Sequence, residues 1–393
     1  MESATHAADS TNPDLHCHTQ GGDMEADGPT ARRFPLIARN RPACLPLPDR
    51  VQALTELAGR AEQQGEQGLA STVFNQSALL ASDLGLPDLS RAMCHLHASA
   101  YLNGTPLTAA SAIRGLEPLV NLARLQIRAG NADEGRQRLL DLYEAVNSGG
   151  NATFEGITVP ADLCRTEADR QEVQAWLWRV LLADGTRTLT STGRWQEALA
   201  HIEQHRGIGS RMLDGRQVAV VAALVDNDTQ RAADLLTATT PGDPWEQEVT
   251  ACLAALCHNG AAQDSDTSSA LVAYYLRHAA KPGLTVFDIR LGLTTLNTIG
   301  SADHASARSL VDDLAQRAST ARDGYAARET LADSHFATLA TKSQLRACQE
   351  LVNACGLDSG ELPVELATAL SSGLQSSESV ILHSLAATVR SGA

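Results

Sequence analysis

The sequence is poor in aromatic residues, which make up only 4% of its 393 residues. Its hydrophobic content of 43% comes mainly from alanine and leucine, two residues that favour helix. No apolar run approaches the roughly 20 residues that a membrane-spanning helix requires. The first 23 residues lack the basic start and apolar centre of a secretory signal. We therefore expect a helical cytoplasmic protein that does not bind a membrane.

Basic residues are also scarce, since 31 Lys and Arg stand against 46 Asp and Glu and the formal net charge is -15. Binding of nucleic acid through a broad face requires clustered basic residues, so we expect no direct nucleic-acid binding. The eight cysteines are scattered and none forms a C-x-x-C pair. This pattern favours buried, reduced thiols in a reducing compartment.

Familiar catalytic motifs are missing from the sequence. It has no glycine-rich phosphate loop and no G-x-S-x-G elbow, and GIGSR at 207–211 lacks the preceding strand of a nucleotide fingerprint. His16, Cys17 and His18 are adjacent, but no second group of ligands lies near them in sequence. We therefore expect neither a cofactor nor a specific metal site.

Two histidines four residues apart, His201 and His205, resemble half of a zinc site. In a zincin the general-base glutamate directly follows the first histidine, whereas here Glu203 lies one position later. That shift turns the carboxylate by about 100° around a helix. We expect these histidines to lie in a groove or on the surface and not to ligate a metal.

The chain divides into two regions. Residues 1–47 are polar, carry several prolines and arginines and lack periodicity, so we expect a disordered or loosely docked arm, with a docked fragment around 34–37 as the alternative. Residues 48–393 show helical apolar spacing in segments of 12 to 20 residues, each closed by Gly, Asn, Asp or Pro. Only residues 153–160 indicate extended chain, and two amphipathic segments are expected at the C-terminus.

Glycines recur at the turns between these segments. Gly65, Gly130 and Gly193 are 65 and 63 residues apart, and half of that spacing is close to the 34-residue tetratricopeptide period. A small residue and then a large one follow each turn: Ala70 and Phe74, Gly135 and Leu139, Ala198 and Ile202. A small residue allows two helices to cross closely, and the large one fills the next gap.

The stretches GRWQEALAHI (193–202) and LTELAGRAEQQGEQGLASTVF (54–74) resemble tetratricopeptide (TPR) repeats. The resemblance extends as a pattern over about residues 50–340, but repeat lengths vary and the closing proline is mostly absent, so peptide-binding residues of the family cannot be carried over. It implies an all-α, right-handed superhelix (α-solenoid) of TPR-like hairpins. The composition resembles that of actinobacterial proteins, in which such arrays often act in regulation. The 47 residues before the array are too few for the helix-turn-helix domain that often precedes it there.

Aspartate and arginine recur around glycines, in LADGTR, LDGRQ and DGYAAR. These side chains either bind a charged peptide end or a phosphate, or form ion pairs within the scaffold. Trp176 and Trp178 face opposite sides of a helix, so one is expected in the core and the other towards a surface. The groove candidates are Asp184, Arg187, Asp214, Arg216, Asp323, Arg328, His201, His205 and Trp178.

A helical repeat array offers a concave surface for binding. We therefore expect a non-catalytic scaffold that binds a protein or peptide partner, in a regulatory or accessory role. The alternative is a sensor that holds a small molecule or signalling peptide inside the superhelix. A metal-assisted enzyme has less support. Exposed terminal repeats can pair, so the sequence also allows a homodimer.

Overall fold

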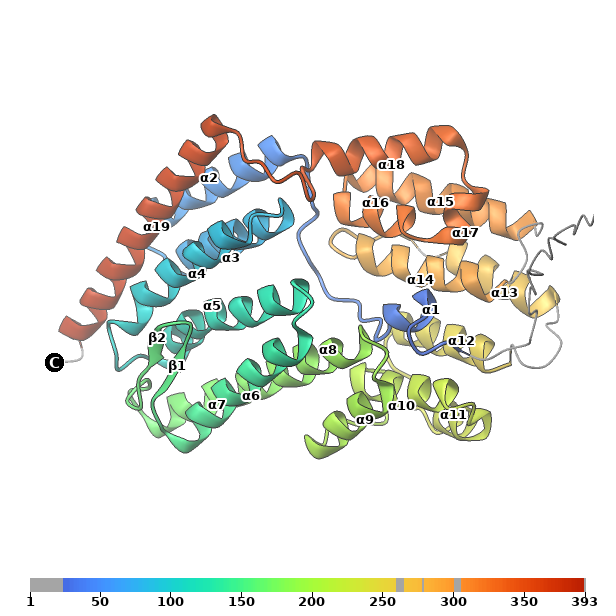
Figure 1. Ribbon diagram of the computed structural model, residues 1–393, viewed down its shortest axis with the longest axis horizontal. Helices are drawn as coiled ribbons and strands as arrows, with labels where there is room; N and C mark the ends of the chain where they lie inside the picture. The colour runs from blue at the N-terminus through green and yellow to red at the C-terminus, as the bar shows by residue number, and fades with distance from the viewer. Residues whose placement is uncertain (1–23, 259–264, 278, 300–304, 392–393) are drawn as a thin grey trace, which may run out of the picture.

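The computed structural model describes residues 24–258, 265–277, 279–299 and 305–391, which are almost entirely helical (Figure 1). The predicted all-α class is confirmed. A short antiparallel hairpin of β1 (Ala152–Phe154) and β2 (Ile157–Val159) lies where the sequence indicated extended chain. No helix of the described ranges is both long enough and apolar enough to span a bilayer.

From α2 to α17, helices that follow one another in sequence pack against one another. The first half contains α2 (Leu47–Gln64), α3 (Gln67–Asp83), α4 (Pro87–Leu102), α5 (Ala109–Arg128), α6 (Ala132–Ser148) and α7 (Glu167–Val180). A π-helical turn, η1 (Leu181–Gly185), leads through α8 (Thr186–Thr190) to the second half. That half contains α9 (Trp195–Gln204), α10 (Asp214–Val225), α11 (Thr229–Thr237), α12 (Pro244–His258), α13 (Ser265–Leu276), α14 (Thr285–Thr298), α15 (Ala305–Ala321), α16 (Gly324–Leu331), α17 (Ser334–Leu339) and α18 (Lys342–Ala354).

The predicted turn glycines end their helices in the left-handed conformation. Their φ angles are +63° at Gly65, +88° at Gly130 and +74° at Gly193, a region that other residues rarely adopt. The small residue after the second turn is also required. A Cβ added to Gly135 would lie 2.7 Å from the carbonyl oxygen of Ala123, so a larger residue would force α5 and α6 apart.

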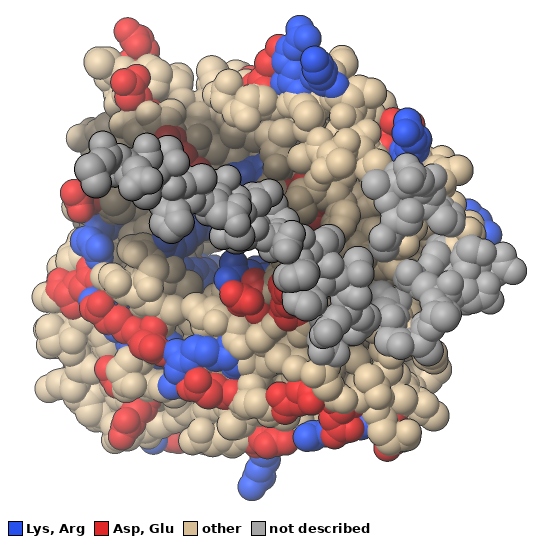
Figure 2. Space-filling view, turned by 45° about the vertical axis from the view of Figure 1, so that its right-hand side comes forward, with Lys and Arg blue, Asp and Glu red and all other residues tan. Residues whose placement is uncertain are grey.

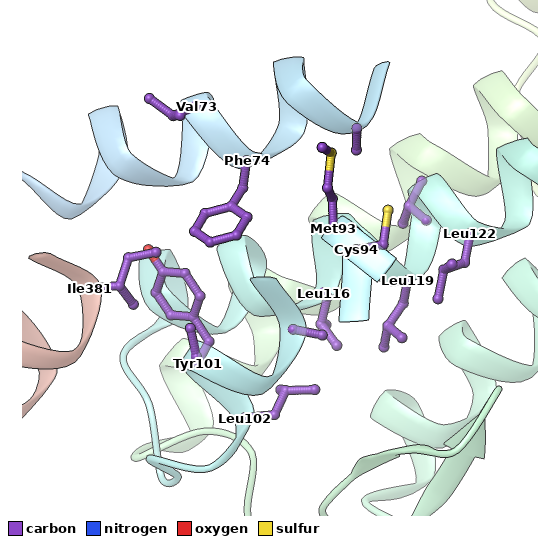
Figure 3. Packing of buried hydrophobic residues seen from close by; sticks show 14 of the residues in the cluster. Val73, Phe74, Met93, Cys94, Tyr101, Leu102, Leu116, Leu119, Leu122 and Ile381 are labelled. Carbon is purple, nitrogen blue, oxygen red and sulfur yellow. The ribbon is translucent and has the colours of Figure 1, made fainter. Parts of the chain in front are cut away.

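Each half has its own hydrophobic core. The first core is built around residues such as Phe74, Tyr101 and Leu116, which Figure 3 shows packed between helices of this half. The second core includes Trp195, which is 1% exposed, and Phe336. The two halves therefore bury apolar surface separately.

The last helix, α19 (Val364–Ser391), returns to the beginning of the array and packs on α2 and α3 (Figure 1). We expected two amphipathic segments here, and that prediction is wrong, because one continuous helix spans both. Gly373 lies within this helix and does not end it. At this glycine α19 approaches α2, because an added Cβ would lie 3.4 Å from Cβ of Ala58. Its buried stripe completes the first core and consists of Leu370, Leu374, Val380, Ile381 and Leu385.

The N-terminal segment, which we define as residues 24–46, runs between the two halves and includes the short helix α1 (Pro29–Arg33) (Figure 1). We expected residues 1–47 to be disordered or loosely docked. The described part packs against the second half, as the alternative of a docked fragment around 34–37 expected, and Ala31, Phe34 and Leu36 of its core are at most 2% exposed. Local periodicity could not indicate this, because the partners of these residues lie far along the chain.

The two halves also meet directly, across a seam opposite the α7–α9 connection. Asp83 of α3 accepts hydrogen bonds from the Arg50 guanidinium at 2.7 Å and from the hydroxyl of Tyr325 in α16. The backbone N–H of Asp358, beyond α18, donates to the carbonyl of Asp83 at 2.8 Å. The N-terminal segment therefore lies in an interior that is bounded by both halves.

Candidate functional site

The interior between the halves is where the chain gathers polar side chains around an extended strand of its own backbone. Gln217 of α10 is fully buried and forms the first anchor. Its Oε1 accepts a hydrogen bond from the Leu36 N–H at 2.6 Å, and its Nε2 donates to the Leu36 carbonyl at 2.8 Å. One amide thus satisfies both backbone groups of a single residue, as a neighbouring strand would in a sheet.

A second anchor holds the end of the segment at Cys44, three residues before α2 begins at Leu47. Asp323 Oδ1 accepts hydrogen bonds at 3.0 Å from the N–H of Cys44 and from the N–H of Tyr325. The Cys44 carbonyl accepts from the Gly324 N–H at 2.8 Å and from the Cys355 thiol at 2.9 Å. Asp323 therefore caps α16 and fixes the segment with the same oxygen.

Two further contacts fix the beginning of the segment. The Arg33 guanidinium lies 2.5 Å from the carboxylate of Asp333, and both side chains are buried. The indole Nε1–H of Trp195 donates to the Ala26 carbonyl at 2.8 Å. A buried charge or a buried indole N–H group without a partner costs free energy of folding. These two contacts therefore favour one position of the segment against the second half.

A cavity of about 230 Å³ lies beside the segment and is lined by both the segment and the helices. We call it the arginine cavity, because four arginines contribute to its wall: Arg39, Arg41, Arg187 and Arg290. Asp184 of η1 and Asp214 of α10 are the acidic residues that line it. Figure 2 shows basic side chains deep inside a hollow of the molecule.

Some charged side chains that line this cavity form ion pairs and others do not. Asp214 accepts two hydrogen bonds of 3.1 Å from Arg39, and Asp184 is engaged by Arg124 at 2.7 Å. Arg290 pairs with Glu329, and the Arg41 guanidinium lies 4.2 Å from the ring centre of Tyr325. Neither Arg41 nor Arg187 has a carboxylate partner among the described residues.

Arg187 is the most unusual of the four. Its side chain is exposed by area but opens into the interior, with the cavity wall around it. Burial in the surrounding protein lowers its pKa to about 10, and the nearby charge of Arg290 acts in the same direction. The nearby carboxylates of Asp184 and Asp214 favour the charge, so the guanidinium stays charged at neutral pH, although it forms no ion pair with a described residue.

The structure brings some of the predicted groove residues together. Asp184, Arg187 and Asp214 all line the arginine cavity, and Asp323 holds the segment. Arg216 instead stabilises the end of α11, where it donates to the Leu235 carbonyl at 2.7 Å.

The remaining predicted groove residues lie away from the cavity. Arg328 pairs with Asp358 at 3.4 Å near the surface, and Trp178 is half-buried on α7. His201 is buried between α9 and η1, and its Nε2–H donates to the Leu181 carbonyl at 3.2 Å. Its ring centre lies 4.8 Å from that of His205, and burial lowers the pKa of both histidines. His201 therefore packs the scaffold and does not face a groove.

Metal ligation has no structural support in the part of the chain that is described. No group of three or more His, Cys, Asp and Glu side chains is placed there to hold an ion. His16, Cys17 and His18 lie outside the described residues.

Several residues of the interior were not found from the sequence, namely Gln217, Asp333, Arg39, Arg41 and Arg290. Gln217 carried a usable signal, since it is a single amide at the start of the apolar run VAVVAALV. Such an amide must find hydrogen bonds when it is buried.

Comparison of the chain with models of known protein families, with curated proteins and with solved structures found no match.

Proposed function

We propose that this protein is a non-catalytic cytoplasmic scaffold, with a regulatory or accessory role, that binds an extended peptide segment of a protein partner in its interior. The observation that carries the proposal is the hydrogen bonding of Gln217 and Asp323 to the backbone of residues 36 and 44. Contacts to backbone groups do not depend on the side chains of the bound strand. They are a common way for a groove to hold an extended peptide.

The N-terminal segment occupies this interior within the same chain. Phe34 and Leu36 supply its apolar contacts, and the backbone supplies the polar ones. A tethered segment competes at an effective concentration that reaches the millimolar range for short linkers. A partner peptide must therefore bind more strongly than the segment, or bind after the segment has been released.

We also propose the finer architecture, a superhelix of TPR-like hairpins. Three observations support it: neighbouring helices pack in chain order, the turn glycines adopt left-handed backbone, and Gly135 lies at a close helix crossing. The interior face would then correspond to the concave face with which such arrays bind extended segments.

The test uses the full-length chain and a fluorescent synthetic peptide of residues 24–46. A double variant, Phe34→Ala with Leu36→Ala, weakens the segment's hold on the interior. Fluorescence anisotropy should show weak peptide binding to the wild type and clearly stronger binding to this variant. Adding Gln217→Ala should remove the gain, whereas Gln171→Ala on the exposed face of α7 should not.

Hydrogen–deuterium exchange supplies the control for this experiment. If exchange shows that the double variant has released residues 24–46, and the peptide still fails to bind, the interior is not a peptide site. A peptide with the same composition in scrambled order tests whether binding depends on the positions of Phe34 and Leu36.

A second candidate function, a sensor for a small molecule, is favoured by one observation. The arginine cavity lies against the segment and contains arginines without carboxylate partners among the described residues. A rise in the melting temperature of the full-length protein on addition of a small anion would support this candidate, and an unchanged melting temperature would argue against it.

A further inference from the structure

The arginine cavity is large enough for a small ligand and is made by distant parts of the chain. Its volume of about 230 Å³ is far larger than the roughly 10–15 Å³ that a single water molecule requires by this measure. Residues 35–41 form one wall, while η1, α8, α10 and α14 form the rest. The docked segment thus forms one side of a space that remains open to solvent.

The wall carries more positive than negative charge, since four arginines face two aspartates. Both aspartates are already paired, Asp184 with Arg124 and Asp214 with Arg39. The surplus therefore falls on Arg41 and Arg187. It occurs inside a chain whose formal net charge is -15, so the general charge balance of the protein does not explain it.

Arginines that lack an ion-pair partner are unfavourable where protein partly surrounds them. Charged side chains away from bulk water are normally paired or hydrogen-bonded, because the low dielectric strengthens both attraction and repulsion. Arg187 lies close enough to Arg290 and Arg39 for both charges to disfavour its protonated form, while Asp184 and Asp214, each already paired with another arginine, favour it. An anion between these groups would replace repulsion with attraction.

We propose that the arginine cavity binds a small, doubly charged oxyanion, either a phosphate group or a short dicarboxylate, with Arg187 as its principal ligand. Two negative charges match the two arginines that form no ion pair with a carboxylate of the described residues. The planar guanidinium fork binds phosphate and carboxylate oxygens in pairs, which a lysine ammonium cannot do. Arg41 and Arg290 line the same space and would contact the other side of the anion.

Binding there would also hold the N-terminal segment in place. Arg39 and Arg41 belong to that segment, whereas Arg187 and Arg290 belong to helices of the scaffold. An anion bridging Arg41 and Arg187 therefore links the two parts. Its presence should slow deuterium exchange of residues 34–44 as well as raise the melting temperature.

The experiment is calorimetric titration of the full-length protein with inorganic phosphate and, separately, with malonate, at an ionic strength fixed with sodium chloride. We expect at least one of the two dianions to bind at a single site. Arg187→Gln should weaken that binding by at least about tenfold, since it removes a charge-assisted bidentate contact. Arg187→Lys should restore part of the affinity, because it keeps the charge but not the fork.

Two controls separate this site from general effects of salt and folding. Arg179→Gln removes an exposed arginine of α7 that does not line the cavity, and should leave binding unchanged. Without anion, Arg187→Gln should melt close to the wild-type temperature, because Arg187 forms no ion pair with a described residue and the lost repulsion from Arg290 offsets the lost attraction to Asp184 and Asp214. Should that variant fold poorly, Arg41→Gln provides the same test.

The outcomes decide the proposal. Binding of either dianion that is weakened by Arg187→Gln or Arg41→Gln supports it, and preference for phosphate or malonate identifies the class of ligand. Absence of binding by both dianions, or equal binding by wild type and Arg187→Gln, overturns it. Neither result depends on whether the interior accepts a partner peptide.

Discussion

The two ends of the described chain are both docked, but by different means. At the C-terminal end, α19 lays a stripe of aliphatic side chains, including Leu370 and Ile381, on the first helices. At the N-terminal end, the segment 24–46 places only Ala31, Phe34 and Leu36 in the second core. It is held otherwise by hydrogen bonds from Gln217 and Asp323 to its backbone.

By this difference, α19 is an integral part of the first half, whereas the segment 24–46 is bound to the second half as a peptide ligand would be. Each half of the molecule is completed by the opposite end of the chain, so neither half is one continuous stretch of sequence. An apolar helix stripe resists removal through buried area, whereas an extended strand held by a few directional bonds can leave while its surroundings persist. We therefore expect α19 to unfold with the first half and the N-terminal segment to detach separately.

The largest effect is expected from Ile381→Ala. Ile381 is fully buried in α19, and truncating such a side chain costs about 2–5 kcal/mol of unfolding free energy. The matched control, Leu382→Ala, changes the next residue, which is 49% exposed, and should cost less than about 0.5 kcal/mol. Urea denaturation measures both; equal losses would contradict the assignment of α19 to the core.

The second-largest effect is expected from acidification, which should lower the free energy of unfolding of the first half. Burial lowers the pKa of His97 to about 3, where it accepts or donates a hydrogen bond with Ser71 at 2.9 Å. The unfolded chain binds this proton below a pKa of about 6.5, so stability is complete above that pH and is lost as pH falls towards 3. When the pH is lowered from 7.5 to 4.5, we expect protonation of His97 in the unfolded chain to reduce the free energy of unfolding by about 2–3 kcal/mol.

The variant His97→Gln tests the origin of this acid sensitivity. It keeps a hydrogen-bonding group near Ser71 but cannot take up the proton, so the decline in urea midpoint with pH should become shallower. If wild type and variant lose stability in parallel as the pH is lowered, another group controls acid unfolding.

A smaller global effect is expected from Phe34→Ala, although Phe34 is 1% exposed. The segment can detach, so the loss of unfolding free energy cannot exceed the free energy of docking; we expect about 1–2 kcal/mol. Trypsin should cut after Arg39 much faster in the variant, while cutting at Arg60 inside α2 stays at the wild-type rate. Equal acceleration at both sites would show global unfolding.

Local features of the fold were predictable because they depend on neighbouring residues. Gly65, Gly130 and Gly193 marked turns through their backbone freedom, and Gly135 marked a close helix crossing. The docking of Phe34 depends on helices more than 150 residues away, so periodicity around it carried no information.

The interior was only partly predictable for the same reason. The recurring Asp-Gly-Arg pattern led to Asp184, Arg187 and Asp214, which line one cavity. The same pattern led to Arg216, which instead stabilises the end of α11. Sequence spacing places a side chain on a helix face, but it does not show which distant element that face meets.

The central claim is that Gln217 holds residues 24–46 as a detachable strand, and deuterium exchange tests it directly. In the wild type, the amides of Leu36 and Cys44 should exchange more slowly than exposed amides, because each donates to a buried side chain. Gln217→Ala should accelerate exchange in residues 34–46 at least about tenfold and leave α19 unchanged. Equal acceleration in both elements, or a segment that already exchanges like unfolded chain in the wild type, would contradict the account.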